Sequence, residues 1–531
     1  MERSVLRSAA LGAVFAAGLT AAPSIAQLWE PGNRLLLPTS GDEAAAEFGH
    51  TLAVGDFDGD GLDDLAVASP FRDVAQLGLD DAGEVEILLA RPGRTFVSDL
   101  RVVGGHDGGW FGWALATGDF DGDGDDELAI GEPRSDAGAD FAGAVLVLDL
   151  ADVGWTAQGA FRQGLDGLPG TPEIDDEFGF TLAAGDFDDD GFDDLAVGVP
   201  LEGVTGTDEG AVEVIYGSAT GLTGAGSQLF AAGQGGVLGT PGDGDTFGWS
   251  LAVADFDADG FADLAIGAPR RNVGALVDAG QVHVLRGGAA GLSATNDLLL
   301  DGVAGDPGAG QGRFGFALAA GDFNYPGIVT CIVTSACAPD LAVGSPTHVA
   351  GGDAGAGRVT VLFSTPGAGP STAGALVLEQ DDLGETIDAG DELGGVLAAG
   401  RLDRGSFLFD PRDAADLLLG VPYEDSAAGA STGVAHLLFG GPSGPATYGV
   451  QTLRVRSGLI AAPAQAQDKF GAALASGDFD GDGWGDLAIG LARRDRPGAL
   501  AAGAVQIQYG ALFGDGCESA ATCGWSTAGC P

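Results

Sequence analysis

Short apolar runs recur along the whole chain, separated by turns rich in Gly, Asp and Pro. In the first segment, the runs Thr51–Val54 and Leu65–Val67 flank an acidic loop, and an alternating stretch follows from Gly83 to Leu89. Short runs bounded by turn residues are typical of β-strands rather than helices. A more polar run, Leu100–Val103, completes a unit of four predicted strands.

This unit occurs seven times. Six copies begin with Phe-Gly, eight residues before an Asp, and the sixth copy in chain order is degraded to Leu393-Gly394; the intervals range from 63 to 79 residues. A stop such as Ser69-Pro70 or Glu132-Pro133 follows the second strand, and it decays to Leu491-Ala492 in the last copy. Seven repeats of four strands predict an all-β fold, a seven-bladed β-propeller of four-stranded blades.

The two ends of the repeat region complement each other. The last repeat supplies three strands before the tail, whereas Arg34–Pro38 precedes the first Phe-Gly, where a fourth strand belongs. We therefore predict that an N-terminal strand completes the last blade and closes the ring, which would otherwise expose an apolar edge.

The acidic loop between the first two strands carries the candidate chemistry. Positions 1, 3, 5 and 9 are carboxylates, position 6 is Gly, and position 7 supplies a backbone carbonyl, which is a set of oxygen ligands suited to Ca2+. Five loops are complete, and we predict about five bound ions. The predicted ligands are Asp56, Asp58, Asp60, Leu62 and Asp64; Asp119, Asp121, Asp123, Asp125 and Glu127; Asp186, Asp188, Asp190, Phe192 and Asp194; Asp255, Asp257, Asp259, Phe261 and Asp263; and Asp478, Asp480, Asp482, Trp484 and Asp486.

Two alternatives for these loops fit the sequence less well. An EF-hand opens in the same way but needs Glu at position 12, where this chain has apolar residues such as Val67 and Ile130. Turns that merely tolerate Asp and Gly would bring several carboxylates together without a cation, and these would repel one another. The sequence therefore favours a structural Ca2+ clip between two strands.

Two repeats depart from the pattern. In the fifth, Asp322-Phe323-Asn324 leads into an insertion before Asp340, and in the sixth Arg401 replaces the first ligand. A cation at the first ligand position argues against an ion in the sixth repeat.

Composition excludes one class of partner. The net charge is −54, with 77 acidic against 23 basic residues, so the chain lacks the basic surface that nucleic acid requires. The excess acid reflects either solubility or a salty habitat, and the sequence leaves both open.

The termini predict export. Residues 1–26 resemble a secretory signal peptide, residues 27–510 form the propeller, and residues 511–531 form a Cys-containing tail. No later run is long enough for a transmembrane helix, so we expect a secreted or cell-surface bacterial protein. Five Cys allow at most two internal disulfides. The tail resembles a C-terminal motif of exported bacterial proteins, and a disulfide-tied end is the alternative.

The Phe-Gly pair, the Asp-x-Asp-x-Asp-Gly-x-x-Asp loop and the Gly-Ala-Pro type of stop occur in order and in register. Together they resemble the FG-GAP repeat family, the propeller of integrin α-subunits, across roughly residues 33–510. The resemblance implies seven blades, Ca2+ in the loops that join strands one and two, and ligand contact on the opposite face.

The sequence leaves two functional classes to compare, a binding module and an enzyme. The five His residues have no triad or metal-ligand context, so we expect no enzyme, although a hydrolase or lyase that uses a carboxylate pair on the propeller face is the alternative. We predict an extracellular binding or adhesion module for a protein or glycan.

Arginines follow the stop after the second strand in four repeats and mark a candidate ligand face. The residues are Arg72, Arg134, Arg270 and Arg493. Local pairing with nearby carboxylates such as Asp73 and Asp136 is the alternative to recognition of an acidic ligand.

Overall fold

The structure is a computed structural model of the chain. It describes residues 20–21, 26–30, 33–38, 45–136, 138–151, 154–165, 167–302, 311–324, 338–402, 414–426, 429–441, 443–447, 450–455, 465–495 and 501–510. All five Cys residues and the predicted tail lie outside these ranges.

Seven antiparallel sheets make up the fold, and within each repeat the strands are hydrogen-bonded in the order of the sequence. Blades 1 to 4 contain β4 (Thr51–Gly55), β5 (Asp64–Ser69), β6 (Glu84–Arg91) and β7 (Thr95–Val103); β8 (Leu115–Gly118), β9 (Glu127–Glu132), β10 (Ala144–Ala151) and β11 (Gly154–Phe161); β12 (Thr181–Gly185), β13 (Asp194–Val199), β14 (Ala211–Tyr216) and β15 (Thr223–Phe230); and β16 (Ser250–Ala254), β17 (Asp263–Ala268), β18 (Gln281–Arg286) and β19 (Ser293–Asp301). Blades 5 to 7 contain β20 (Leu318–Gly321), β21 (Asp340–Gly344), β22 (Val359–Thr365) and β23 (Gly369–Leu378); β24 (Val396–Gly400), β25 (Asp416–Val421), β26 (Val434–Leu438) and β27 (Gln451–Leu453); and β28 (Phe470–Gly477), β29 (Asp486–Leu491) and β30 (Ala504–Gln508).

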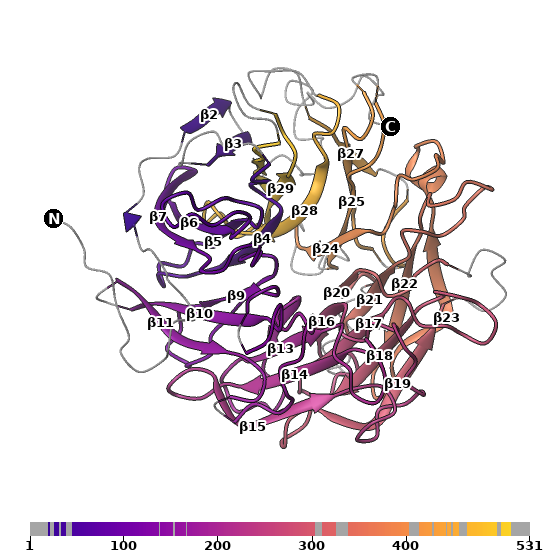
Figure 1. The fold of residues 1–531 in the computed structure, drawn as a ribbon. Coiled ribbons are helices and arrows are strands. Elements are labelled where there is room, and N and C mark those ends of the chain that lie inside the picture. Colours follow the sequence, from indigo (N-terminus) through magenta and orange to yellow (C-terminus); the bar gives the residue numbers. More distant parts are fainter. Residues whose placement is uncertain are drawn as a thin grey trace.

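The blades form a closed ring (Figure 1). The first strand of each blade contacts the first strand of the next, and β28 of the last blade contacts β4 of the first. These strands therefore surround the central axis. The predicted all-β, seven-bladed propeller is confirmed.

The N-terminal strand closes the ring as predicted. Strand β3 (Asn33–Leu37) pairs antiparallel with β30, with Leu36 opposite Val505, and β2 (Ala26–Glu30) pairs with the outer side of β3. Figure 1 shows β2 and β3 in indigo beside the yellow β29 of the same sheet. Leu35 and Leu36 are buried, each in a different apolar cluster on either side of blade 7.

One more short strand pair precedes β2 in the chain. Strand β1 (Thr20–Ala21), which lies within the predicted signal peptide, pairs with β7 at Leu100 and Arg101. The signal peptide itself stays a prediction.

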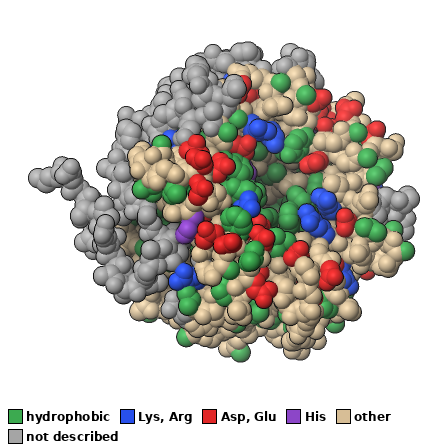
Figure 2. Space-filling view, viewed as in Figure 1, with side chains coloured by type: hydrophobic (Ala, Val, Ile, Leu, Met, Phe, Trp, Pro, Cys, Tyr) green, Lys and Arg blue, Asp and Glu red, His purple; other side chains and the backbone are tan. Residues whose placement is uncertain are grey.

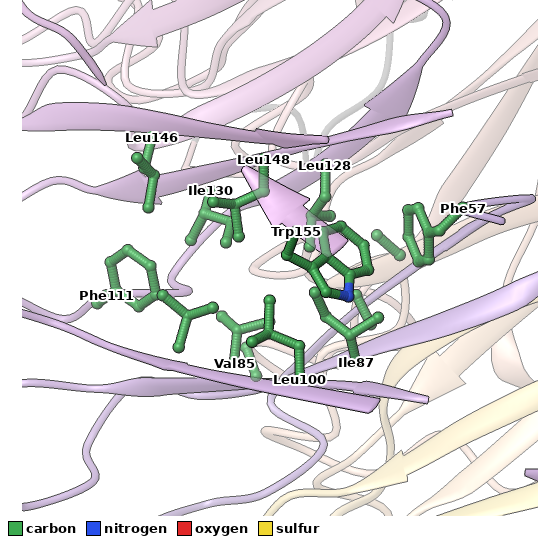
Figure 3. Packing of buried hydrophobic residues seen from close by; sticks show 14 of the residues in the cluster. Phe57, Val85, Ile87, Leu100, Phe111, Leu128, Ile130, Leu146, Leu148 and Trp155 are labelled. Carbon is green, nitrogen blue, oxygen red and sulfur yellow. The ribbon is translucent and has the colours of Figure 1, made fainter. Parts of the chain in front are cut away.

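The hydrophobic core lies between neighbouring blades. In the cluster of Figure 3, Val85 and Ile87 of blade 1 pack against Leu128, Ile130 and other residues of blade 2. Each repeat with an intact motif also buries two Phe side chains, that of the Phe-Gly pair and that at position 2 of the acidic loop. The repeat signature thus supplies the packing between blades.

The Phe-Gly pair joins each blade to the blade before it. Phe111 forms a parallel bridge with Gly83, and a Cβ atom at Gly83 would lie 2.2 Å from the carbonyl oxygen of Phe111. Gly83 also has φ of +89°, a conformation that glycine adopts without strain. Phe48 bridges Gly503 in the same way, across the closure of the ring.

The acidic loops join blades on the other side of the sheet. The Asp126 amide donates to the Asp56 carbonyl at 2.9 Å, and the Asp56 amide donates to Asp126 Oδ2 at 3.0 Å. Asp193 and Asp63, at the same loop position, make the same pair of bonds to Asp119 and Asp478. Position 8 of one loop therefore fastens it to position 1 of its neighbour.

Helical structure is almost absent from the described residues, where one short 3-10 helix spans Gln380–Leu383. No helix in the described part of the chain has the length and apolar character needed to cross a membrane.

Candidate functional site

The first candidate region is the set of acidic loops, which lie together on one face because each joins the first strand of its blade to the second. Each acidic loop takes the number of its blade. Within loop 1, Asp56 Oδ1 accepts the Asp60 amide at 3.1 Å and Asp56 Oδ2 accepts the Gly61 amide at 2.8 Å. Gly61 has φ of +84°, which explains the invariant glycine at position 6. The other four complete loops repeat both bonds.

Carboxylates converge in all five complete loops. In four of them an oxygen from each of positions 1, 3 and 9 lies within 4.8 Å of the others, and in loop 4 the converging positions are 1, 3 and 5. The groups are Asp56, Asp58 and Asp64; Asp119, Asp121 and Glu127; Asp186, Asp188 and Asp194; Asp255, Asp257 and Asp259; and Asp478, Asp480 and Asp486. No comparable group occurs elsewhere among the described residues.

The carboxylate at position 9 is the buried member of each loop. Asp64 is fully buried and accepts the Phe57 amide at 3.1 Å and the Ala90 amide at 2.6 Å. Burial, with neighbouring carboxylates adding to it, raises the pKa of Asp64 to about 8. The pKa of Asp194 is raised to about 7 and that of Asp263 to about 6 for the same main reason. These loops therefore hold more negative charge than their surroundings stabilise.

The structure also contains oxygen atoms suited to a cation. Asp58, Asp188 and Asp257, all at position 3, each bury an Oδ1 atom that has no hydrogen-bond partner. Carboxylate oxygens of this kind are the ligands that hard divalent cations prefer. The donor set thus fits a metal ion in these loops, as the sequence predicts.

Blades 5 and 6 keep the frame of the loop without its carboxylate cluster. Asp340 and Asp416, at the place of position 9, accept the amides of Phe323 and Leu402 as Asp64 accepts that of Phe57. Arg401 keeps the backbone role of the first Asp, because its carbonyl accepts the Gly485 amide at 2.9 Å. Position 9 therefore holds the strand pair together in blades that lack a complete ligand set.

The opposite face contains the loops that follow the second strands. The backbone of the second residue after each stop forms two hydrogen bonds. Its amide donates to a carbonyl at the end of the second strand, and its carbonyl accepts the amide of a Gly ahead of the third strand. The Arg72 amide, for example, donates to the Ser69 carbonyl, and the Arg72 carbonyl accepts the Gly83 amide. Arg72, Arg271 and Arg494 occupy this position, whereas Arg134, Arg270 and Arg493 precede it by one residue. The four candidate arginines thus occupy two different loop positions.

The candidate ligand-face arginines have different surroundings. Arg72 is largely buried and lies 3.5 Å from Glu84, and Arg493 lies 3.1 Å from Glu47. Arg134 lies over the Trp110 ring at 4.4 Å, and Arg270 over the Trp249 ring at 5.7 Å. Arg134 also lies 3.9 Å from Glu177, so three of the four arginines lie against a glutamate.

Five aromatic rings form a continuous arc around the axis on this face. They are the residues directly after Phe-Gly in blades 1 to 5, and each lies just before the first strand of its blade. Successive ring centroids are 5.1, 5.6, 4.8 and 5.5 Å apart, within the range of favourable aromatic contact. We call His50, Trp113, Phe180, Trp249 and Phe316 the aromatic arc.

The aromatic arc is partly exposed and open on one side. All five rings are half-buried, and blades 6 and 7 have Gly395 and Ala472 at the same position. Phe71 and Trp110 extend the arc outwards in blades 1 and 2. On the face seen in Figure 2, hydrophobic side chains surround a hollow at the centre of the ring, with basic side chains at its edge.

A protein-family model matches five of the seven blades. The FG-GAP repeat model matches residues 48–88, 111–148, 178–215, 247–285 and 470–507, which cover the five blades with complete acidic loops. The chain is an integrin-like FG-GAP β-propeller.

Two curated relatives that match this chain are much longer proteins. It is 35% identical over 230 residues to integrin alpha-V of Gallus gallus, covering 41% of the chain and 20% of the relative. It is 31% identical over 199 residues to phosphatidylinositol-glycan-specific phospholipase D of Homo sapiens, covering 37% and 21%. The FG-GAP propeller thus spans about a fifth of the length of either relative.

Among solved structures, the rhamnogalacturonan lyase PL11 of Bacillus licheniformis aligns with a TM-score of 0.40 and 15% identity, covering 91% of this chain and 75% of that one. A similarity at that level carries no conclusion about activity.

The aromatic arc is the feature of this FG-GAP propeller that the sequence analysis missed. Its signal was present in the sequence, because the residue after Phe-Gly is aromatic in five consecutive repeats. The register of the repeats, rather than the number of aromatic residues, reveals it.

Proposed function

We propose that this FG-GAP propeller is an extracellular binding module that contacts a protein or glycan through the face of the aromatic arc. The observation that carries the proposal is the arc itself, five half-buried rings in contact around the axis. Aromatic and Arg side chains dominate the binding energy of protein interfaces, and Trp110 and Trp249 each lie beneath a guanidinium group. A ligand that covered the arc would bury all of this surface at once.

The distribution of exposed apolar side chains supports the same face. Among the described residues, the large exposed hydrophobic side chains other than Val97 lie in loops on the side of the aromatic arc; they are Leu77, Leu165, Ile174, Leu238, Leu276, Val277 and Val349. Exposed apolar groups that gather on one face are typical of an interaction surface. These loops also differ in length between blades, as recognition loops do.

The acidic loops have the opposite character, which suits a scaffold. They repeat the same hydrogen bonds in five blades, and an Asp at position 8 links neighbouring blades by a pair of hydrogen bonds in three places. We propose that Ca2+ binds there, with Asp, Glu and one backbone carbonyl as ligands, and stabilises the folded ring by binding it in preference to the unfolded chain.

The carboxylate pairs on the side of the aromatic arc do not suit catalysis. Asp391 and Glu424 are the clearest pair, and each is 4% exposed, with Gln380 Nε2 donating to both at 2.7 and 3.2 Å. A substrate would have to displace the buried Gln380 side chain to reach them. We therefore infer binding without turnover, at an extracellular or cell-surface location consistent with integrin relatives.

The test compares purified extracellular proteins and an array of purified glycans as ligands for the calcium-loaded chain. The double variant Trp113→Ala/Trp249→Ala should lose at least about tenfold in affinity for whatever the wild type binds. The matched control Trp113→Phe/Trp249→Phe retains the rings and should retain most of the affinity. Equal binding by all three proteins would overturn the assignment of this face.

A further inference from the structure

The five complete acidic loops differ in one respect that their sequences do not show, which is the charge placed against them. Arg91 at the end of β6 lies 2.7 Å from Asp58 and 3.1 Å from Asp60 in loop 1. Arg94, in the turn between β6 and β7, crosses to blade 7 and lies 2.7 Å from Asp480. Within the described ranges, no Lys or Arg forms an ion pair with a carboxylate of loop 2 or loop 3.

Loop 4 shows the closest association with an arginine. Arg286 Nη1 lies 3.0 Å from Asp263 Oδ2 and 3.1 Å from Asp257 Oδ2, and its side chain is 13% exposed. Positions 9 and 3 of the loop thus share one guanidinium group. Asp263 is also the position-9 carboxylate that is missing from the converging group in its loop. Arg286 therefore occupies the place where a cation would bind these two carboxylates.

The register of the third strand explains the difference between blades. Leu285 pairs with Leu264 in blade 4 as Leu148 pairs with Leu128 in blade 2, and the next residue in each strand lies beside the acidic loop. In blade 4 that residue is Arg286, whereas in blade 2 it is Asp149. The same position adds a positive charge to loop 4 and a negative charge to loop 2.

Asp149 places its negative charge beside loop 2. It follows Leu148, which pairs with Leu128 directly after the loop carboxylate Glu127. The neutral Gln158 side chain donates to Asp121 Oδ2 at 2.8 Å, so loop 2 has no positive partner among the described residues. A divalent cation would relieve the repulsion in loop 2 and would have to displace a guanidinium group in loop 4.

We propose that arginines divide the cation sites of this propeller into two affinity classes, with Arg286 serving as a resident counter-charge in loop 4. Loops 2 and 3 bind divalent cations tightly, and loops 1, 4 and 7 bind them more weakly because an ion pair must be broken first. Blade 4 consequently keeps its loop ordered at cation concentrations that leave loop 4 empty. This inference rests on the proposed binding of Ca2+ in the loops.

The test is a Ca2+ titration of the cation-free chain, in which native mass spectrometry counts the bound ions and calorimetry measures their affinities. Two ions should bind before the rest, and Arg286→Gln should move one further ion into the tight class, with an increase in affinity of roughly tenfold or more. Asp149→Asn should weaken one of the two tight sites. The matched control Arg358→Gln removes an arginine that pairs with Glu379, away from the acidic loops, and should leave the titration unchanged.

The outcomes separate this inference from the proposal on which it rests. Failure of the wild type to bind any Ca2+ would reject the structural-calcium proposal itself. Binding of all ions with one affinity, or equal titrations for Arg286→Gln and Arg358→Gln, would overturn the two classes while leaving the calcium proposal intact. An Arg286→Gln variant that is unfolded without Ca2+ still tests the inference. If it then folds at Ca2+ concentrations that fill only its tight sites, the inference is supported. If it stays unfolded at saturating Ca2+, the inference is contradicted.

Discussion

Glu86 and Glu213 occupy the same register position in blades 1 and 3, opposite Val67 and Val197, but only Glu86 is hydrogen-bonded across its strand pair. Ser98 Oγ donates to Glu86 Oε1 at 2.6 Å. Both carboxylate oxygens of Glu213 are buried without a partner, and burial raises its pKa to about 8. The propeller thus tolerates an uncompensated acid between two of its blades.

This difference predicts opposite effects of the same substitution. Glu213→Met should raise the free energy of unfolding at pH 8 by about 1–3 kcal/mol, because it removes a buried group that is costly to ionise. Glu86→Met should lower it, because Ser98 loses its acceptor. Chemical denaturation of both variants at saturating Ca2+ checks the prediction, and stabilisation by both or by neither would contradict it.

The gain at Glu213 should depend on pH. The unfolded chain releases the proton near the ordinary value of 4.5, whereas the folded chain retains it up to the raised pKa of about 8. The folded state therefore binds more protons in this window, and its stability falls as pH rises from 4.5 to 8. The stability difference between Glu213→Met and the wild type should grow across the window and level off above it. A difference that is constant from pH 4.5 to 8 would show that the carboxyl group is not buried as described.

Closure of the ring depends on two adjacent leucines. Leu35 packs between blades 6 and 7, and Leu36 packs between blades 7 and 1. Leu36→Ala should lower the free energy of unfolding by about 2–4 kcal/mol, and deletion of residues 27–40 should destabilise the whole ring. Thermal unfolding measures both, and an unchanged melting curve after the deletion would refute closure by the N-terminal strand.

The link between neighbouring loops gives a separate prediction. Asp126→Ala removes the acceptor of the Asp56 amide and should cost about 1–2 kcal/mol of stability at saturating Ca2+. Ala262 stands at this position in blade 4, where the backbone bond to Asp186 alone remains, so the ring should still close. Loss of a bound ion together with the stability would instead assign Asp126 to the metal site.

Metal removal tests the acidic loops themselves. Chelation should lower the melting temperature, and Asp186→Asn/Asp188→Asn should remove one ion from the count obtained by native mass spectrometry. Asp189→Asn is the matched control, because Asp189 lies in the same loop at position 4 and is not among the predicted ligands. Fewer than three ions in the wild type, or a melting temperature indifferent to chelator, would reject structural calcium.

Most of the fold could be predicted because the repeat signature is itself structural. Phe-Gly joins each blade to the one before it, the acidic loop connects strands one and two, and Arg34–Pro38 is the missing strand. These features are local in the sequence and recur in register, so the number of copies predicts the number of blades in the ring. The charges placed against each loop were not predictable in this way, because Arg94 reaches loop 7 from the opposite end of the chain.

The candidate site was predicted in part for the same reason. The predicted ligand carboxylates lie within nine residues of one another, and three of them converge in each complete loop. The aromatic arc joins residues of five repeats and becomes evident only when the blades are arranged around the axis. The arginines illustrate the limit most clearly, since a shift of one residue separates the buried Arg72 from Arg134, which lies over Trp110.

The most direct test of the binding-module proposal is to screen one panel of purified extracellular proteins and glycans with three calcium-loaded proteins. These are the wild type, the aromatic-arc variant Trp113→Ala/Trp249→Ala, and the acidic-loop control Asp189→Asn, with the ion count of each verified beforehand. The account predicts that a ligand retained by the wild type and by the control is lost by the aromatic-arc variant at an unchanged ion count. Retention of that ligand by the aromatic-arc variant, or its conversion to product by the wild type, would contradict the account.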